Sequence, residues 1–190
     1  MNSVEPIRDF KKIIAIKQFL RFQPRNYLLF TLGINSALRI GDMLKLQVKD
    51  LLNEQGEIRE ILSGKAEKTG KEYKIKINEA TKEAINYYLD NIRPSNINQY
   101  LFYRKEKTDG PISRIRVWQL IQFWTKKVGL NYRNYGAHTL RKTWGYQARK
   151  QGITIEQVSA KLGHRSVEVT RRYIGIDQDE INQIEDEINI

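Results

Sequence analysis

The sequence predicts an α+β fold that is mainly α-helical and contains one small three-stranded antiparallel sheet. Apolar residues recur at helical spacing along most of the 190 residues, a pattern typical of helices that pack one face on a core. Strict alternation of apolar and polar residues is confined to the middle of the chain, where it indicates short strands. Proline, which interrupts helices, is scarce at 4 residues. These observations favour a helical domain with the sheet inserted near the front.

Three helices are expected ahead of the sheet. Near-helical spacing of apolar residues predicts a helix over 7–21, with Pro6 as a natural first-turn residue. Pro24 opens a second apolar helix over 24–35. A short third helix is expected over 40–46.

The strands of the expected sheet follow. Three short, partly alternating segments at 57–63, 65–68 and 72–77 predict them, and Lys-Thr-Gly-Lys at 68–71 supplies a hairpin turn. Over 73–77 the alternation is strict, so three apolar side chains lie on one face of the strand and two lysines on the other.

Helices resume after the sheet and continue almost to the end of the chain. Asn78 is a suitable N-cap for a helix over 79–91, and residues 94–98 have the composition of a loop. Further helices are expected over 113–128, over 138–151, over 154–161 with Gly163 as the C-cap, and from a Ser166 cap through Tyr173.

Length and composition limit the class of protein. A chain of 190 residues can form one globular domain with a core, or one domain with a small appendage. No apolar run approaches the roughly 20 residues that span a bilayer, and the N-terminus lacks the layout of a signal peptide. The absence of cysteine excludes disulfides and thiolate metal sites and fits a reducing cytoplasm.

The charge is strongly basic and unevenly distributed. The formal net charge is +11, yet none of the 33 basic residues and six of the 22 acidic residues follow Tyr173, so residues 1–173 carry +17. A basic body with an acidic tail is expected of a protein that binds nucleic acid. A solvated lysine-rich surface is the alternative that charge alone leaves open.

The two histidines of the chain each lie in a short polar pattern. His138 and Arg141 are one turn apart on a predicted helix, so an imidazole and a guanidinium can converge on one group. His164 follows Leu162-Gly163. A capping histidine and a surface arginine are the structural alternative. Two histidines without cysteine make a poor transition-metal site, so no metal is expected.

Three more residues complete the set of candidates. Arg39 lies between apolar residues where two helices meet, and Asp42 could pair with it and hold it in place. Lys68 lies at the expected hairpin tip, where it either protects a sheet edge or delivers an ammonium group into a DNA groove. Tyr173 lies near the end of the last predicted helix, before the acidic tail.

Read in order, these residues resemble the tyrosine recombinase family, the phage integrase superfamily. The resemblance runs from about Ile7 to Tyr173 and includes Ala-Leu-Arg-Ile-Gly-Asp at 37–42, Lys-Thr-Gly-Lys at 68–71 and His-Thr-Leu-Arg-Lys-Thr at 138–143. It continues with Leu-Gly-His-Arg-Ser and the Arg-Tyr pair downstream. Each catalytic position of the family is filled by a permitted residue: Arg39, Lys68, His138, Arg141, His164 and Tyr173.

The resemblance implies a site-specific recombinase that cuts and rejoins DNA through a covalent 3′-phosphotyrosyl link on Tyr173, without metal, ATP or other cofactor. Arg39, Arg141 and His164 would bind the non-bridging phosphate oxygens. His138 would assist deprotonation of the phenol, and Lys68 would act as general acid. The alternatives are a type IB topoisomerase, which shares the chemistry, and a non-catalytic DNA-binding module.

The expected organisation is a catalytic domain over 1–176 and an acidic C-terminal tail helix over 177–190. Ile181, Ile184 and Ile188 form an apolar stripe on the tail, which would pack on its own domain or dock on a neighbouring subunit. Expected partners are double-stranded DNA, three further copies in a tetramer and accessory DNA-bending proteins, in the prokaryotic cytoplasm at the nucleoid. The chain is either an excised catalytic domain or a short single-domain member.

Overall fold

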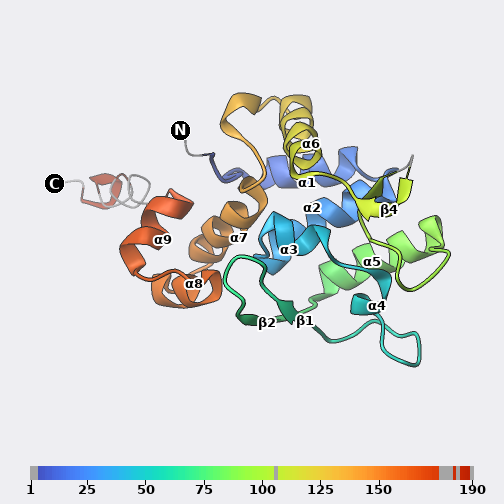
Figure 1. Cartoon of the computed structure of the whole chain (residues 1–190). Coiled ribbons are helices and arrows are strands. Elements are labelled where there is room, and N and C mark those ends of the chain that lie inside the picture. The colour runs from blue at the N-terminus through green and yellow to red at the C-terminus, as the bar shows by residue number, and fades with distance from the viewer. Residues whose placement is uncertain (1–3, 105–106, 176–181, 183–184, 189–190) are drawn as a thin grey trace.

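Helices predominate in the computed structural model, which describes residues 4–104, 107–175, 182 and 185–188 (Figure 1). Two short hairpins interrupt them. In chain order the elements are α1 (Phe10–Phe19), α2 (Pro24–Ser36), α3 (Ile40–Leu44), α4 (Val48–Leu51), β1 (Ile61–Lys65), β2 (Glu72–Lys76), α5 (Glu79–Ile92), β3 (Tyr103–Arg104), β4 (Lys107–Pro111), α6 (Arg114–Lys127), the 3₁₀ turn η1 (Tyr132–Asn134), α7 (Thr139–Lys150), α8 (Ile155–Leu162) and α9 (Val167–Ile174).

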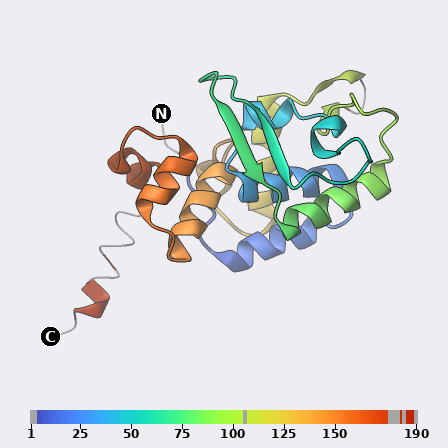
Figure 2. The same cartoon turned by 90° about the horizontal axis from the view of Figure 1, so that it is seen from below.

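The elements form a larger body and a smaller group of helices at one end. Helix α2 packs against both α5 and α7 and so joins the two parts. Figures 1 and 2 show α7, α8 and α9 together at the end opposite to α4 and β4. The turn of the β1–β2 hairpin and the end of α8 line one cavity.

Two apolar clusters hold these parts together. The main cluster lies within the body and includes the fully buried Phe30, Tyr88 and Trp124. The second cluster fixes the group of three helices and consists of Ala37, Tyr146, Ile155, Val158, Leu162 and Ile174. Because Ala37 belongs to the end of α2, the second cluster also connects the three helices to the body.

The predicted three-stranded sheet is wrong, because the strands within the described residues form two separate two-stranded sheets. Strand β1 pairs antiparallel with β2, as expected, but residues 65–68 do not form a third strand. Their backbone closes the turn instead, since the Ala66 N–H donates to Lys71 and the Gly70 N–H donates to Ala66. The second sheet, β3–β4, was not predicted because its segment shows no alternation of apolar residues.

Most helix boundaries agree with the sequence, and the differences have local causes. Helix α1 begins at Phe10 because the Asp9 carboxylate caps the Lys11 N–H at 2.8 Å. The backbone of the preceding residues forms hydrogen bonds with α7 instead of continuing the helix: the Ile7 N–H donates to Thr143 Oγ1 at 2.8 Å. The third helix ends early, at Leu44, and the short helix α4 was not expected.

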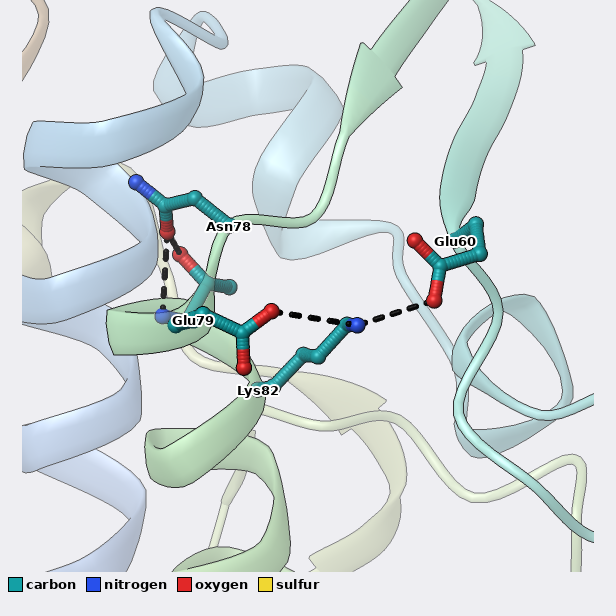
Figure 3. Close-up of polar contacts among 5 residues, drawn as sticks. Glu60, Asn78, Glu79 and Lys82 are labelled. Carbon is teal, nitrogen blue, oxygen red and sulfur yellow. Dashed lines mark hydrogen bonds and ion pairs between the residues drawn. The ribbon is translucent and has the colours of Figure 1, made fainter.

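The start of α5 confirms the predicted N-cap and connects this helix to the first hairpin (Figure 3). The Asn78 side chain accepts hydrogen bonds from the Thr81 N–H at 3.1 Å and from the Thr81 hydroxyl at 2.7 Å. Lys82 Nζ lies 3.3 Å from Glu79 and 2.8 Å from Glu60, which precedes β1. These contacts hold the base of the hairpin against α5.

Gly145 on α7 allows the closest approach of α9, and we expect an added methyl group there to destabilise the fold. A Cβ atom at this position would lie 2.7 Å from Ile174 Cγ2. Gly145→Ala should therefore lower the free energy of unfolding by about 1–3 kcal/mol, the usual effect of overpacking. Urea unfolding measures this change.

A double-mutant cycle supplies the control. Ile174→Ala destabilises by itself because Ile174 is fully buried. In its background the clashing methyl is gone, so Gly145→Ala should then have a much smaller effect. Purely additive effects of the two changes would contradict the proposed clash.

Candidate active site

Arg141 is the buried cation on which the site is built. Its side chain comes from α7, is 7% exposed, and donates hydrogen bonds to the carbonyl groups of Ala37 and Leu162. Ala37 caps the C-terminal end of α2 in the left-handed conformation, with φ of 59°, and Leu162 is the last residue of α8. Helix C-termini carry unsatisfied carbonyl groups and partial negative charge, which favour a guanidinium between them.

Arg39 lies beside Arg141 because it follows Ala37 by two residues, at the N-cap position of α3. The two arginines line one cavity of about 580 Å³ between the hairpin and the end of α8. Arg39 also lines an adjoining cavity of about 280 Å³ together with Lys68 and His138. The structure thus brings the predicted cations from α3, α7 and the hairpin turn to one hollow.

His138 occupies the N-cap position of α7 at the mouth of this hollow. Partial burial lowers its pKa, and the neighbouring charges of Arg141, Lys142, Arg39 and Lys68 lower it further. The imidazole is therefore neutral at pH 7 and has a lone pair that can accept a proton.

His164 is fixed by a contact that also indicates its tautomer. Its Nδ1 lies 3.0 Å from Thr170 Oγ1, and the Thr170 hydroxyl donates its single proton to the Ser166 carbonyl at 3.2 Å. Nδ1–H must then be the donor to Thr170, which leaves Nε2 for another partner. Burial, followed by Arg141 and Arg39, lowers the pKa of His164.

Tyr173 reaches these residues from α9. Its hydroxyl lies 3.4 Å from His138 Nδ1 and is close enough to the Arg141 guanidinium for the charge of Arg141 to act on it. The ring meets the His164 ring edge-on, with centroids 4.9 Å apart. Burial raises the pKa of Tyr173 although Arg141 and Arg39 oppose this change, so the hydroxyl remains protonated until a base removes its proton.

Asp42 lies at the site, but its partner differs from the one that the sequence suggested. An Arg39–Asp42 pair is not among the ion pairs found within the described residues. The buried Asp42 carboxylate instead accepts the Glu67 N–H at 2.8 Å. Because Glu67 precedes Lys68, this bond fixes the turn that carries Lys68. The Asp42 charge also favours the cationic form of Arg141 by raising its pKa against the larger effect of burial.

Sequence reasoning missed two residues that touch the predicted set. Lys142 Nζ lies 4.8 Å from the centre of the Tyr173 ring, and Thr170 holds His164. Lys142 follows His138 by four residues, a spacing that places both on one helix face and could have indicated its position.

The described residues contain neither a metal-binding cluster nor a membrane-spanning helix. No group of three or more His, Cys, Asp or Glu side chains in that part of the chain could hold a metal ion. In the same part, every helix is too short or too polar to cross a membrane.

Comparison with known protein families gives a match over residues 8–180 to the phage integrase family. The chain belongs to the phage integrase family. Probable integrase/recombinase YoeC of Bacillus subtilis (strain 168) is 41% identical over 180 residues, or 94% of this chain and 93% of YoeC. Tyrosine recombinase XerA of Pyrococcus horikoshii is 27% identical over 166 residues, or 87% of this chain and 54% of XerA. The chain thus spans nearly all of YoeC and about half of XerA.

Solved structures of this family share the fold. The crystal structure of XerA recombinase superposes with a TM-score of 0.76 at 18% identity, covering 99% of this chain and 65% of XerA. XerH recombinase bound to palindromic difH substrate gives a TM-score of 0.70 at 18% identity, covering 97% of this chain and 52% of XerH. The catalytic-domain fold and the recombinase class of the phage integrase family are therefore confirmed. The comparisons give no support to a topoisomerase or a non-catalytic module.

The lowered pKa values of the two histidines in this integrase-family site let us predict how stability depends on pH. Both pKa values are lowered in the folded protein, so the unfolded chain binds protons more readily, from its ordinary pKa of about 6.5 downward. The free energy of unfolding should have its full value above pH 6.5 and should fall as the pH decreases through the pKa values of the two histidines in the folded protein. Urea unfolding between about pH 7.5 and 5.5 measures this change.

A double variant, His138→Asn with His164→Asn, is the matched control. It lacks both histidines of the chain, so its free energy of unfolding should depend less on pH over the same range. An equally steep decrease in the double variant would contradict a role for the histidines.

Proposed function

We propose that the chain cleaves and rejoins double-stranded DNA at a specific site, with Tyr173 as the nucleophile. The observation that carries this proposal is the position of the Tyr173 hydroxyl, which contacts His138 and Arg141 beside a cationic hollow. A phenol, a neutral imidazole and two guanidinium groups around one cavity suit displacement at a phosphodiester better than they suit a purely structural role.

The arginines would stabilise the charge that develops at phosphorus. In-line attack increases negative charge on the non-bridging oxygens, and fixed cationic donors are effective at stabilising it. Arg39 and Arg141 line one cavity, and each guanidinium can bind two oxygens. His164 would add a hydrogen bond through Nε2 once it is protonated. These side chains supply the charge that a metal ion supplies in other phosphoryl-transfer enzymes, so the proposal includes neither metal nor cofactor.

Proton transfer would involve His138 and Lys68. As the Tyr173 oxygen bonds to phosphorus, its proton passes to His138 Nδ1, which lies 3.4 Å away. The bond from phosphorus to the 5′ oxygen breaks, and Lys68 donates a proton to that oxygen. The product is a 3′-phosphotyrosyl link and a free 5′ hydroxyl. Attack by a 5′ hydroxyl of another duplex reverses these steps without ATP and exchanges the strands.

The partner we propose is double-stranded DNA lying across the cavity. Basic residues line the cavity on both sides: Lys71 and Lys74 from the hairpin, and Lys161 and Arg165 from the end of α8. Among related structures, XerH is bound to difH substrate, and a lambda integrase dimer is bound to a COC′ core site. For this chain we propose a tetramer on DNA, with accessory DNA-bending proteins, in the prokaryotic cytoplasm at the nucleoid.

Replacing Tyr173 by phenylalanine tests the proposal directly. We expect Tyr173→Phe to abolish covalent attachment to DNA while the fold and DNA binding are retained, because only the attacking oxygen is lost. Nicked suicide duplexes made from the DNA that flanks the gene trap the adduct, and a denaturing gel detects it.

Wild-type protein on the same duplexes is the control. An adduct that persists in Tyr173→Phe would remove Tyr173 from the role of nucleophile. Relaxation of a supercoiled plasmid without any exchange between paired sites would favour a topoisomerase instead.

We propose that residues 1–176 form the catalytic domain and that the tail, 177–190, docks on a neighbouring subunit. Ile181 and Ile184 of the predicted stripe lie outside the described residues. Ile188 is described and is 61% exposed. Residues 185–187 are helical and exposed. Exposure of this apolar residue supports docking in trans, where a partner's groove would cover it.

Removing the tail tests this docking. A chain that ends at Gly175 should fold and bind DNA as a monomer, because Gly175 already caps α9, but it should no longer form tetramers on DNA. Light scattering coupled to size-exclusion chromatography of the DNA complexes measures the difference. The substitution Ile188→Ser in the full chain should weaken assembly in the same direction, and unchanged assembly in both variants would rule out docking in trans.

A further inference from the structure

Lys142 is a buried lysine that the mechanism above does not use. It is 5% exposed, although lysine is rarely buried. It follows Arg141 on α7, and its ammonium group faces the Tyr173 ring with 4.8 Å between Nζ and the ring centre. A cation at this distance from an aromatic face is attracted to the ring, and burial strengthens the attraction.

Two contacts together determine how the Tyr173 ring lies. Lys142 is over its face. The His164 ring meets it edge-on at 4.9 Å and 77°. With both contacts in place, the ring cannot turn without losing one of them. Its hydroxyl is thereby directed to His138 and Arg141.

Lys142 also influences the proton acceptor. His138 and Lys142 are four residues apart on α7 and so lie on one face of the helix. The charge of Lys142 lowers the pKa of His138, together with the charges of Arg141, Arg39 and Lys68. Facing Lys142 from the N-terminal segment is Glu5, whose carboxylate favours the charged form of the lysine although burial lowers its pKa.

We infer that Lys142 is a positioning residue for the proposed cleavage reaction: its buried ammonium group orients the Tyr173 ring and keeps His138 able to accept the phenolic proton. This inference rests on the proposed function. As the Tyr173 oxygen loses its proton, negative charge spreads into the ring, so a cation over the ring face stabilises the transition state more than the ground state.

A purely structural role makes a different prediction. If Lys142 only filled space between α7 and α9, an unbranched apolar side chain of similar length would replace it without effect on the chemistry. Removing a buried charge would then leave stability unchanged or increase it. Lys142→Met therefore separates the two roles, and Lys142→Arg retains the cation. Lys126→Met is the matched control, because Lys126 also lies over a tyrosine ring, 5.5 Å from the centre of Tyr132, but on the exposed end of α6.

The first measurement needs no DNA. NMR titration follows the His138 imidazole, whose signal is assigned by its loss in His138→Asn, since the chain has only 2 histidines. We expect the pKa of His138 to rise in Lys142→Met, to stay low in Lys142→Arg and to be unchanged in Lys126→Met. If Lys142→Met does not fold, Lys142→Gln provides the same uncharged test.

The second measurement is the single-turnover rate of adduct formation on nicked duplexes made from the DNA that flanks the gene. Lys142→Met should be slower than wild type by about 10- to 30-fold, the effect of losing a desolvated cation from an aromatic face, with DNA affinity unchanged. Lys142→Arg should restore most of the rate. Should Lys142→Met titrate and cleave like wild type, the inference is overturned. Absence of an adduct in wild type would instead contradict the proposed function, and the titration would still decide the role of Lys142.

Discussion

The arrangement of the site depends on one buried guanidinium, that of Arg141. Its two hydrogen bonds reach the ends of two helices that are far apart in sequence, at Ala37 after α2 and at Leu162 in α8. Arg39 follows the first of these carbonyls by two residues, and His164 follows the second by two. The two bonds that stabilise a buried charge therefore also determine where Arg39 and His164, the other phosphate ligands that we propose, lie. Loss of either bond would leave the buried Arg141 charge less well compensated and would displace Arg39 or His164.

Among the described residues that line the two cavities of the site, basic side chains outnumber carboxylates. Arg39, Arg141, Lys142 and Lys68 together lower the pKa of His138, and Asp42 is the acidic residue that acts on Arg141. Mutual repulsion among these cations destabilises the free protein, and an anion in the hollow would relieve it. A phosphodiester supplies one negative charge, and its transition state supplies more, so the attraction increases along the proposed reaction. Burial and the same field lower the pKa of His138, which suits the role of proton acceptor that we propose for it.

Local signals in the sequence were sufficient for most helices and for the order of the site residues. Asn78 and Ser166 each cap a helix with the side chain that the sequence indicated. The predictions from sequence were wrong where contacts between residues distant in sequence determine the structure. The segment before α1 is extended because α7 binds its backbone. The β3–β4 pair and the partner of Asp42 likewise depend on the folded arrangement, which spacing alone does not give. Spacing places Lys142 on the same face of α7 as His138, but its contact with the Tyr173 ring exists only because α9 packs beside α7.

The position of Tyr173 bears on what a neighbouring subunit could do: supply the proposed nucleophile, or change the position of one that the chain already supplies. Ile174, the next residue, is fully buried in the second cluster, and Gly145 lets α9 lie close to α7. These contacts hold the phenol beside His138 of the same chain, so under the proposed function the chain would not need a neighbour to supply its nucleophile. Gly175 then ends α9 in the left-handed conformation, with φ of 70°, two residues before the tail begins. A partner that bound the tail would therefore act on α9 through a link of two residues, 175–176, and could change the position of the nucleophile that we propose.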